Sequence, residues 1–156
     1  MAESIVQVSS LLLPMRGFNL VLPHANIAEV LQGVEFESSS DDIPWLVGSF
    51  EWRGIRIPVV SFETLCGRES GPTGKAAACV VVYGLEGIGD LQFYALELQA
   101  LPRPMVLDAD RVESVSDDSG DRNAFVAQNV LVAGQPGIIP ELAGVERGIV
   151  ADRLGG

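Results

Sequence analysis

His24 is the only histidine of this 156-residue chain, so a catalytic triad or a histidine-activated thiol would have to use it. The chain contains no Gly-x-Ser-x-Gly elbow, which presents the nucleophile in many hydrolases. Cys66 and Cys79 are the only cysteines, they do not form a Cys-x-x-Cys pair, and neither has a histidine beside it. Hydrolase chemistry, zinc binding and a disulfide framework are therefore not indicated.

Two glycine-rich segments have compositions that could hold a phosphate or a dinucleotide. Residues 67–75 end in Gly74-Lys75, but Glu69 occupies the upstream glycine position of a P-loop, and a strand-like segment follows instead of a helix. Residues 84–89 reverse the dinucleotide-binding spacing and also lead into a strand-like segment. We interpret the first segment as a linker and the second as a hairpin loop.

Two further segments suggest other chemistry. Residues 117–121 are acidic, but they lack the alternating ligands and the closing glutamate of a calcium-binding EF-hand loop. Gly155-Gly156 resembles the tail of sulfur carriers and ubiquitin-like proteins, which leaves a carrier as a rival hypothesis. The interpretation that we favour has no catalytic residue, no metal site and no cofactor.

The charge balance restricts the possible partners. Ten basic residues against 21 acidic ones give a net charge of −11, which repels nucleic-acid phosphates and anionic lipid headgroups. No apolar stretch reaches the roughly 18 residues of a membrane span, and the N-terminal Met-Ala-Glu-Ser lacks the basic region of a secretory signal. We therefore predict a cytoplasmic protein that neither binds nucleic acid nor inserts directly into a membrane.

The apolar segments are short, rich in Val and Ile, and separated by Gly and Pro, which is typical of an all-β protein with short helices. We expect hairpins from residues 5–13 with 18–22, from 50–52 with 55–60, and within 105–115. Further strands are expected over 76–83, 91–98, 124–133 and 138–139, with the turn at 134–137, and short helices over 27–31, 61–66 and 142–154. The chain should form one domain, residues 1–156, whose two subdomains meet near the linker at 67–75.

The segment 44–60 contains both tryptophans of the chain, Trp45 and Trp52, next to the dipeptide Arg53-Gly54. This concentration is notable in a chain with only 6% aromatic residues. We expect a hairpin here, with a type I turn closed by a glycine bulge and the Arg53 side chain pointing outward. Physical reasoning alone leaves open whether the tryptophans belong to the core or to an interface.

Three residues of this segment have predicted structural roles. Gly54 permits the positive φ angle that the turn requires. Gly48 is expected to end a helical turn before the strand that begins at Phe50. Pro58 cannot donate a ladder hydrogen bond, so its strand should lie at a sheet edge or end its pairing there.

The pattern Gly48-x-x-x-x-Arg53-Gly54-x-x-x-Pro58-Val59 resembles the central motif of CheW-like domains. Upstream, the alternating residues 18–22 and the element Ile27-x-Glu29-Val30 are also similar to that family. The Trp-Arg-Gly form followed by Pro-Val-Val-Ser-Phe-Glu looks closest to the ChpC type, which occurs in chemosensory systems of type IV pili. In the second half, residues 94–98 and 110–115 only approximate the family signature.

The resemblance implies two SH3-like, five-stranded β-barrels around a shared core. It also implies a non-catalytic signal-transduction adaptor that couples the cytoplasmic tip of a methyl-accepting chemoreceptor to the regulatory domain of a CheA-type histidine kinase, in a chemosensory system that controls type IV pili and twitching motility. The alternative is a small β-barrel interaction module that serves another partner. The candidate protein-binding residues are Arg53, Glu51, Trp52, Trp45 and Arg56.

Overall fold

The computed structural model describes residues 8–15, 17–38, 44–65, 75–84, 91–107, 112–114, 126–132 and 134–155. One sheet contains β1 (Val8–Pro14), β2 (Asn19–Pro23), β9 (Arg103–Leu107), β10 (Val112–Ser114), β11 (Val126–Val132) and β12 (Gln135–Pro140). The other contains β3 (Ile27–Glu35), β4 (Glu37–Ser38), β5 (Leu46–Trp52), β6 (Ile55–Val60), β7 (Lys75–Tyr83) and β8 (Phe93–Leu98). The helical elements are η1 (His24–Asn26), α1 (Phe62–Leu65) and α2 (Leu142–Gly155).

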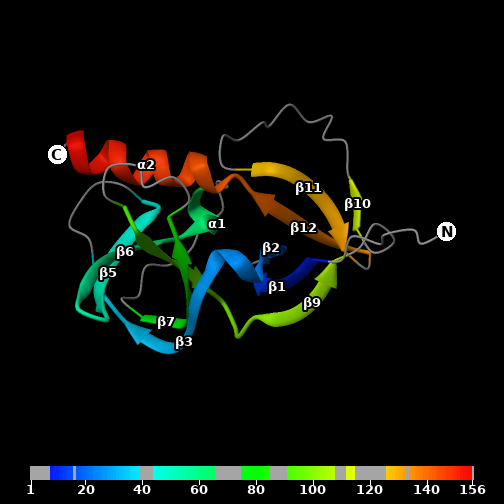
Figure 1. The fold of residues 1–156 in the computed structure, drawn as a ribbon, viewed down its shortest axis with the longest axis horizontal. Coiled ribbons are helices and arrows are strands. Elements are labelled where there is room, and N and C mark those ends of the chain that lie inside the picture. Colours follow the sequence, from blue (N-terminus) through cyan, green and yellow to red (C-terminus); the bar gives the residue numbers. More distant parts are fainter. Residues whose placement is uncertain are drawn as a thin grey trace.

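The strand order is β10-β11-β12-β2-β1-β9 in the first sheet and β3-β7-β8-β6-β5-β4 in the second. In the second sheet the end strands, β3 and β4, are separated by Phe36 alone, so the chain closes this sheet into a barrel. The chain begins in the first sheet, forms the whole second sheet and returns to the first, which intertwines the two (Figure 1). The predicted pair of small barrels is confirmed, and the sixth strands, β4 and β10, have only two and three residues.

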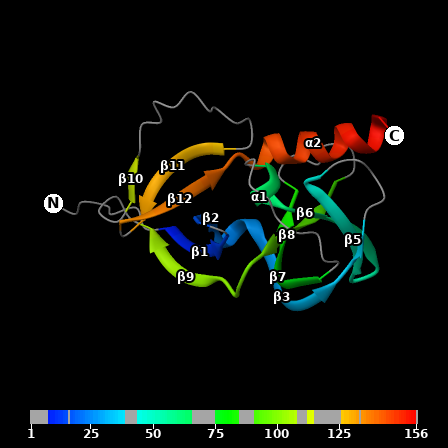
Figure 2. The ribbon, with the colours of Figure 1, turned by 180° about the vertical axis from the view of Figure 1, so that it is seen from behind.

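The largest apolar cluster is shared between the two sheets and α2. Leu13 and Leu20 of the first sheet contribute to it with Val80 of the second and with Val145 and Ile149 of α2, all of them fully buried. A smaller cluster fills each barrel. The predicted shared core is therefore present, and α2 runs along the second sheet to the C-terminus (Figure 2).

Strand β7 shows why its sequence is an uninterrupted apolar run. Val80 and Val82 face the shared cluster, while Cys79 and Val81 face the interior of the second barrel. A strand that is buried on both faces carries apolar side chains at consecutive positions. The sequence of residues 76–83 thus reflects a location between two cores.

Several predicted elements are present. The hairpins β1–β2 and β5–β6 pair in antiparallel register, and α2 occupies the expected C-terminal region. Ser61 caps the N-terminus of α1, because the backbone N–H of Thr64 donates to the Ser61 hydroxyl at 3.4 Å. The linker at 67–75 lies outside the described residues except for Lys75, which begins β7.

The short helix predicted over residues 27–31 is wrong. These residues belong to β3, a nine-residue strand that pairs with β7. A register shift between Ile27 and Glu29 inserts an extra residue, so Ile27 packs on the shared cluster whereas Leu31 packs inside the second barrel. Because of this shift, the apolar residues of β3 do not alternate strictly, and their spacing resembles that of a helix.

The hairpin predicted within residues 105–115 is also wrong. Strand β9 pairs with β1 and β10 pairs with β11, at opposite ends of the first sheet. Alternating apolar residues indicate a strand but not its partner, which here is distant in sequence. The turn of the next hairpin comes earlier than expected, since Val132 pairs with Gln135 and residues 135–137 lie in β12.

Cys79 provides a prediction about the pH dependence of stability. Burial, and secondarily the charge of Glu97 opposite it on β8, raises the pKa of the Cys79 thiol from 9.0 to about 12. The neutral thiol therefore contributes stability that is complete below pH 9 and is lost as the pH rises toward 12. We expect the free energy of unfolding, measured by urea denaturation, to fall between pH 9 and 11.

The Cys79→Ala variant should lose less stability over this pH range than the wild type, whatever its stability at neutral pH. A residual slope is expected, because burial, and next the neighbouring Glu146, also raise the pKa of Tyr94. Equal slopes in Cys79→Ala and the wild type would contradict the assignment to Cys79.

Candidate protein-binding site

The β5–β6 hairpin presents Arg53 at its tip. Trp52 pairs with Ile55, which leaves Arg53 and Gly54 as a two-residue turn with φ angles of 49° and 79°. Positive φ at both positions defines a type I′ turn, so the predicted type I turn with a glycine bulge is wrong. Within the described ranges, Arg53 is the only residue other than glycine with a positive φ, a conformation that costs an L-residue about 1–2 kcal/mol.

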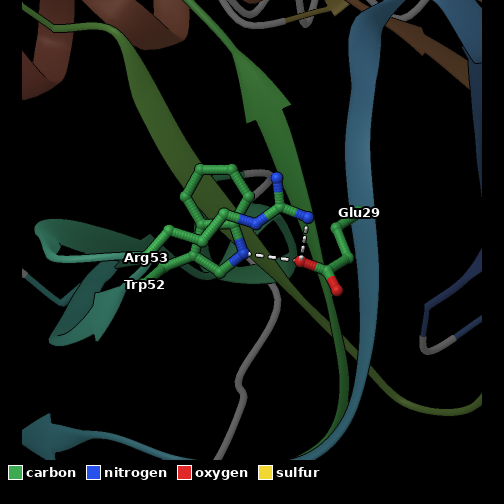
Figure 3. A network of polar contacts seen from close by, with 3 residues as sticks. All are labelled: Glu29, Trp52 and Arg53. Carbon is green, nitrogen blue, oxygen red and sulfur yellow. Dashed lines mark hydrogen bonds and ion pairs between the residues drawn. The ribbon is translucent and has the colours of Figure 1, made fainter.

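Glu29 of β3 binds both residues at this tip (Figure 3). The indole N–H of Trp52 donates to Glu29 Oε2 at 2.7 Å, and the Arg53 guanidinium donates to the same oxygen at 3.4 Å. The guanidinium carbon also lies 4.8 Å from the centre of the Trp52 ring. Two contacts therefore orient a guanidinium whose side chain is 68% exposed.

Trp52 connects this network to the interior of the second barrel. The residue is only 7% exposed, and its ring centre lies 4.8 Å from that of Phe93 at an angle of 57°. Phe93 in turn contacts Tyr83, whose ring centre is 5.6 Å away and which is 45% exposed. Trp52 is therefore a core residue rather than an exposed interface residue. Its ring also supports the Arg53 guanidinium at the surface.

Three exposed residues and the half-buried Glu29 surround Trp52 and Phe93 at this end of the barrel. We name them the hairpin-tip surface: Glu29, Arg53, Ile55 and Tyr83. Ile55, the partner of Trp52 across the hairpin, is 40% exposed. The surface combines a fixed cation with exposed aliphatic and aromatic groups, a combination that is common at protein interfaces.

Arg56 and Glu51 lie apart from this network. They pair with each other across the hairpin, and both are exposed. The Arg56 guanidinium forms an ion pair with Glu37 of β4, which lies on the far side of β5. Because successive strand residues point to opposite faces, Arg56 lies on the outer face of the barrel, opposite the face of Ile55 and Ile57.

Trp45 also lies apart from the hairpin tip. It is half-buried against the shared cluster, and its carbonyl oxygen accepts a hydrogen bond from the Ser61 N–H at 2.8 Å. It therefore anchors the start of the segment to α1. The structure brings together Trp52 and Arg53 from the predicted set, but not Glu51, Arg56 or Trp45.

Gly48 has a different role from the one predicted, and Pro58 fits only the second of its two predicted alternatives, a limit of strand pairing. Gly48 lies inside β5 and ends no helical turn. Pro58 lies in β6, which is an inner strand of the sheet, so the predicted edge position is wrong. The parallel ladder from β6 to β8 nevertheless begins at Val59, directly after the proline. The missing N–H of Pro58 therefore lies just outside that ladder.

Four residues of the site were not among those predicted from the sequence: Glu29, Ile55, Phe93 and Tyr83. Glu29 did stand in the element Ile27-x-Glu29-Val30, so the family resemblance contained a signal for it. Phe93 and Tyr83 face each other at the ends of β7 and β8, far in sequence from the hairpin. Their proximity to Trp52 arises only when the barrel closes.

The part of the chain that the structure describes holds no candidate metal site and no candidate membrane-spanning helix. It contains no cluster of three or more His, Cys, Asp or Glu side chains that could hold a metal ion. Nor does any helix there have both the length and the hydropathy of a membrane span. Of the protein-binding residues predicted from the sequence, Arg53 belongs to the hairpin-tip surface and Trp52 lies beneath it.

Comparisons with known proteins give a family match and a solved structure of similar fold. The model of the CheW-like domain family matches residues 9–148, which include both sheets. The solved structure of the scaffolding protein TtCheW from Thermoanaerobacter tengcongensis is similar, with a TM-score of 0.69 at 19% sequence identity, over 91% of this chain and 89% of that one. No curated protein sequence matches the chain.

Proposed function

The chain belongs to the CheW-like domain family of non-enzymatic scaffold proteins, and from this premise we propose that it couples chemoreceptors to a CheA-type histidine kinase. The observation that carries the proposal is the family match over residues 9–148, which spans both barrels and not only the central motif. The partners are the regulatory domain of the kinase and the cytoplasmic tip of a methyl-accepting receptor, which places the chain in the cytoplasm.

The hairpin-tip surface is the proposed contact with one of these partners. Arg53 is oriented before binding, by Trp52 beneath it and by Glu29 beside it. Binding therefore costs less side-chain entropy than it would with a freely rotating arginine. Exposed Ile55 and Tyr83 supply apolar area next to the charge. The backbone strain at Arg53 supports a functional role, because strained conformations concentrate at such sites.

The finer assignment is to a ChpC-type adaptor in the chemosensory control of type IV pili and twitching motility. Its support is the sequence Trp52-Arg53-Gly54 followed by residues 58–63, Pro-Val-Val-Ser-Phe-Glu. A strain that lacks the protein should lose twitching motility, and the wild-type gene should restore it. Normal twitching in that strain would contradict this assignment while leaving the adaptor role intact.

Substituting Arg53 tests the contact. Arg53→Asn removes the guanidinium but keeps a residue that tolerates the left-handed turn, so the fold should be retained. We expect the affinity for one partner, either the kinase regulatory domain or the receptor fragment, to fall by at least about tenfold. Isothermal titration calorimetry measures this affinity. Circular dichroism and thermal melting check that the variant is folded.

Arg56→Asn is the matched control, since it removes a second exposed arginine of the same hairpin that pairs on the outer face. It should bind both partners as the wild type does. Equal binding by Arg53→Asn and wild type would remove Arg53 from the contact. Failure of the wild type to bind either partner would reject the adaptor and favour an interaction module with another partner. A diglycine carrier is not favoured, because Gly155 is the last residue of α2.

A further inference from the structure

A cavity of about 570 Å³ opens on the first sheet, and none of its lining residues belongs to the hairpin-tip surface. Its walls come from β1, from β9 and from the β11–β12 hairpin, with η1 at one side. Its size lies within the range of ligand-binding pockets. Nothing in the proposed function uses it.

The floor of this cavity is apolar and continuous with the interior of the first barrel. Val132 is buried, and Leu12 and Met105 are half-buried against the same small cluster. Val106, also in the lining, is 39% exposed. Apolar side chains that reach from a core to an open cavity offer a partner area that it can remove from water.

The ionisable side chains in the described lining of the cavity are both of basic residues. Arg103 and His24 belong to the described lining, and no described Asp or Glu does, although the chain carries a net charge of −11. Among the residues that the structure describes, Arg53 and Arg56 each form an ion pair with a glutamate, but Arg103 forms none. An arginine without such a partner beside an apolar floor is complementary to a carboxylate with apolar neighbours.

We propose that this cavity binds an extended segment of a partner protein in which a glutamate or aspartate is flanked by aliphatic residues. The carboxylate contacts the Arg103 guanidinium, and the aliphatic side chains cover Leu12, Met105 and Val132. Most of the lining side chains are half-buried or exposed, so the site is shallow. A chain segment lying across it fits better than a small molecule, which a binding pocket normally encloses.

This inference goes beyond the adaptor role, because it holds whichever partner binds the hairpin-tip surface. The test uses the full chain, labelled with ¹⁵N, and two peptides: acetyl-Val-Leu-Glu-Leu-Val-amide and its glutamine counterpart. Saturable amide shifts are expected at Arg103, Met105 and Gln135 with the glutamate peptide. The glutamine peptide should bind about tenfold more weakly, since it loses the charge-assisted hydrogen bond.

Arg103→Gln should abolish the preference for the glutamate peptide, while its spectrum outside the cavity remains that of the folded wild type. Arg147→Gln, which removes another exposed arginine, on α2, is the matched control and should keep the preference. The proposal is overturned by equal binding of the two peptides to the wild type, by shifts confined to the hairpin-tip surface, by no shifts at millimolar peptide, or by an unchanged preference in Arg103→Gln.

Discussion

Trp52→Ala is expected to lower the free energy of unfolding by about 3–5 kcal/mol, the cost of removing a large aromatic side chain from a core. Trp52 is 7% exposed and packs in the interior of the second barrel, with its ring against Phe93. The truncation leaves a cavity among residues of β5, β6, β7 and β8, whose backbones are held by ladder hydrogen bonds and cannot collapse freely. Chemical denaturation measures the loss.

Trp45→Ala is the matched control within the same segment. Trp45 is only half-buried and lies at the margin of the shared cluster, so its truncation should cost clearly less than that of Trp52. Equal losses for the two variants would show that the segment responds as a whole, and that the core position of Trp52 is not the cause.

The contribution of the Trp52–Glu29 hydrogen bond to stability can be measured separately from that of Trp52 packing. Trp52→Phe keeps an aromatic ring but removes the indole N–H that donates to Glu29. Glu29→Gln keeps an acceptor but removes the charge that also attracts Arg53. In a double-mutant cycle the two changes should couple by about 1–2 kcal/mol, since the hydrogen bond has a charged acceptor. Additive losses would contradict the shared network.

This network explains which parts of the site could be predicted from the sequence. The hairpin and its turn at Arg53-Gly54 follow from local signals: alternating apolar residues and a glycine at the position that needs a positive φ. Glu29 directly follows a register shift in β3, which removes the alternation from which a strand is recognised. Local patterns therefore predicted one side of the network and missed the other.

The pairing of strands is the second feature of the fold that local sequence patterns do not predict. The sequence predicts a hairpin within residues 105–115, but the pairing of β9 with β1 and of β10 with β11 joins segments distant along the chain. Alternation states which residues of a strand share a face and not which strand lies beside it. The family resemblance implied two barrels around a shared core, and this arrangement is observed, but it did not give these strand pairings.

Gly48→Ala is expected to cost about 3 kcal/mol, the upper end of the usual range for an added methyl group in a packed site. A Cβ at this position would overlap the backbone carbonyl oxygen of Glu37 and lie 2.5 Å from Cδ2 of Phe36. Strand β4 has only two residues, paired with Ser49 and Gly48. The backbone of β4 must therefore move, and with it Phe36, which is buried inside the second barrel.

Gly137→Ala is the matched control, because Gly137 also lies in a strand but its nearest obstacles are methyl groups of Val130 and Val132 at 3.3 Å. Those side chains can adjust, so the change should stay within about 1 kcal/mol of the wild type. Denaturation of both variants, with hydrogen exchange at the amides of β4 and β5, measures the difference. Similar stabilities would contradict the steric explanation. A larger loss in Gly48→Ala would show that Gly48 is required for the close approach of two backbones, whereas Gly54 in the same motif has a positive φ and open space around it.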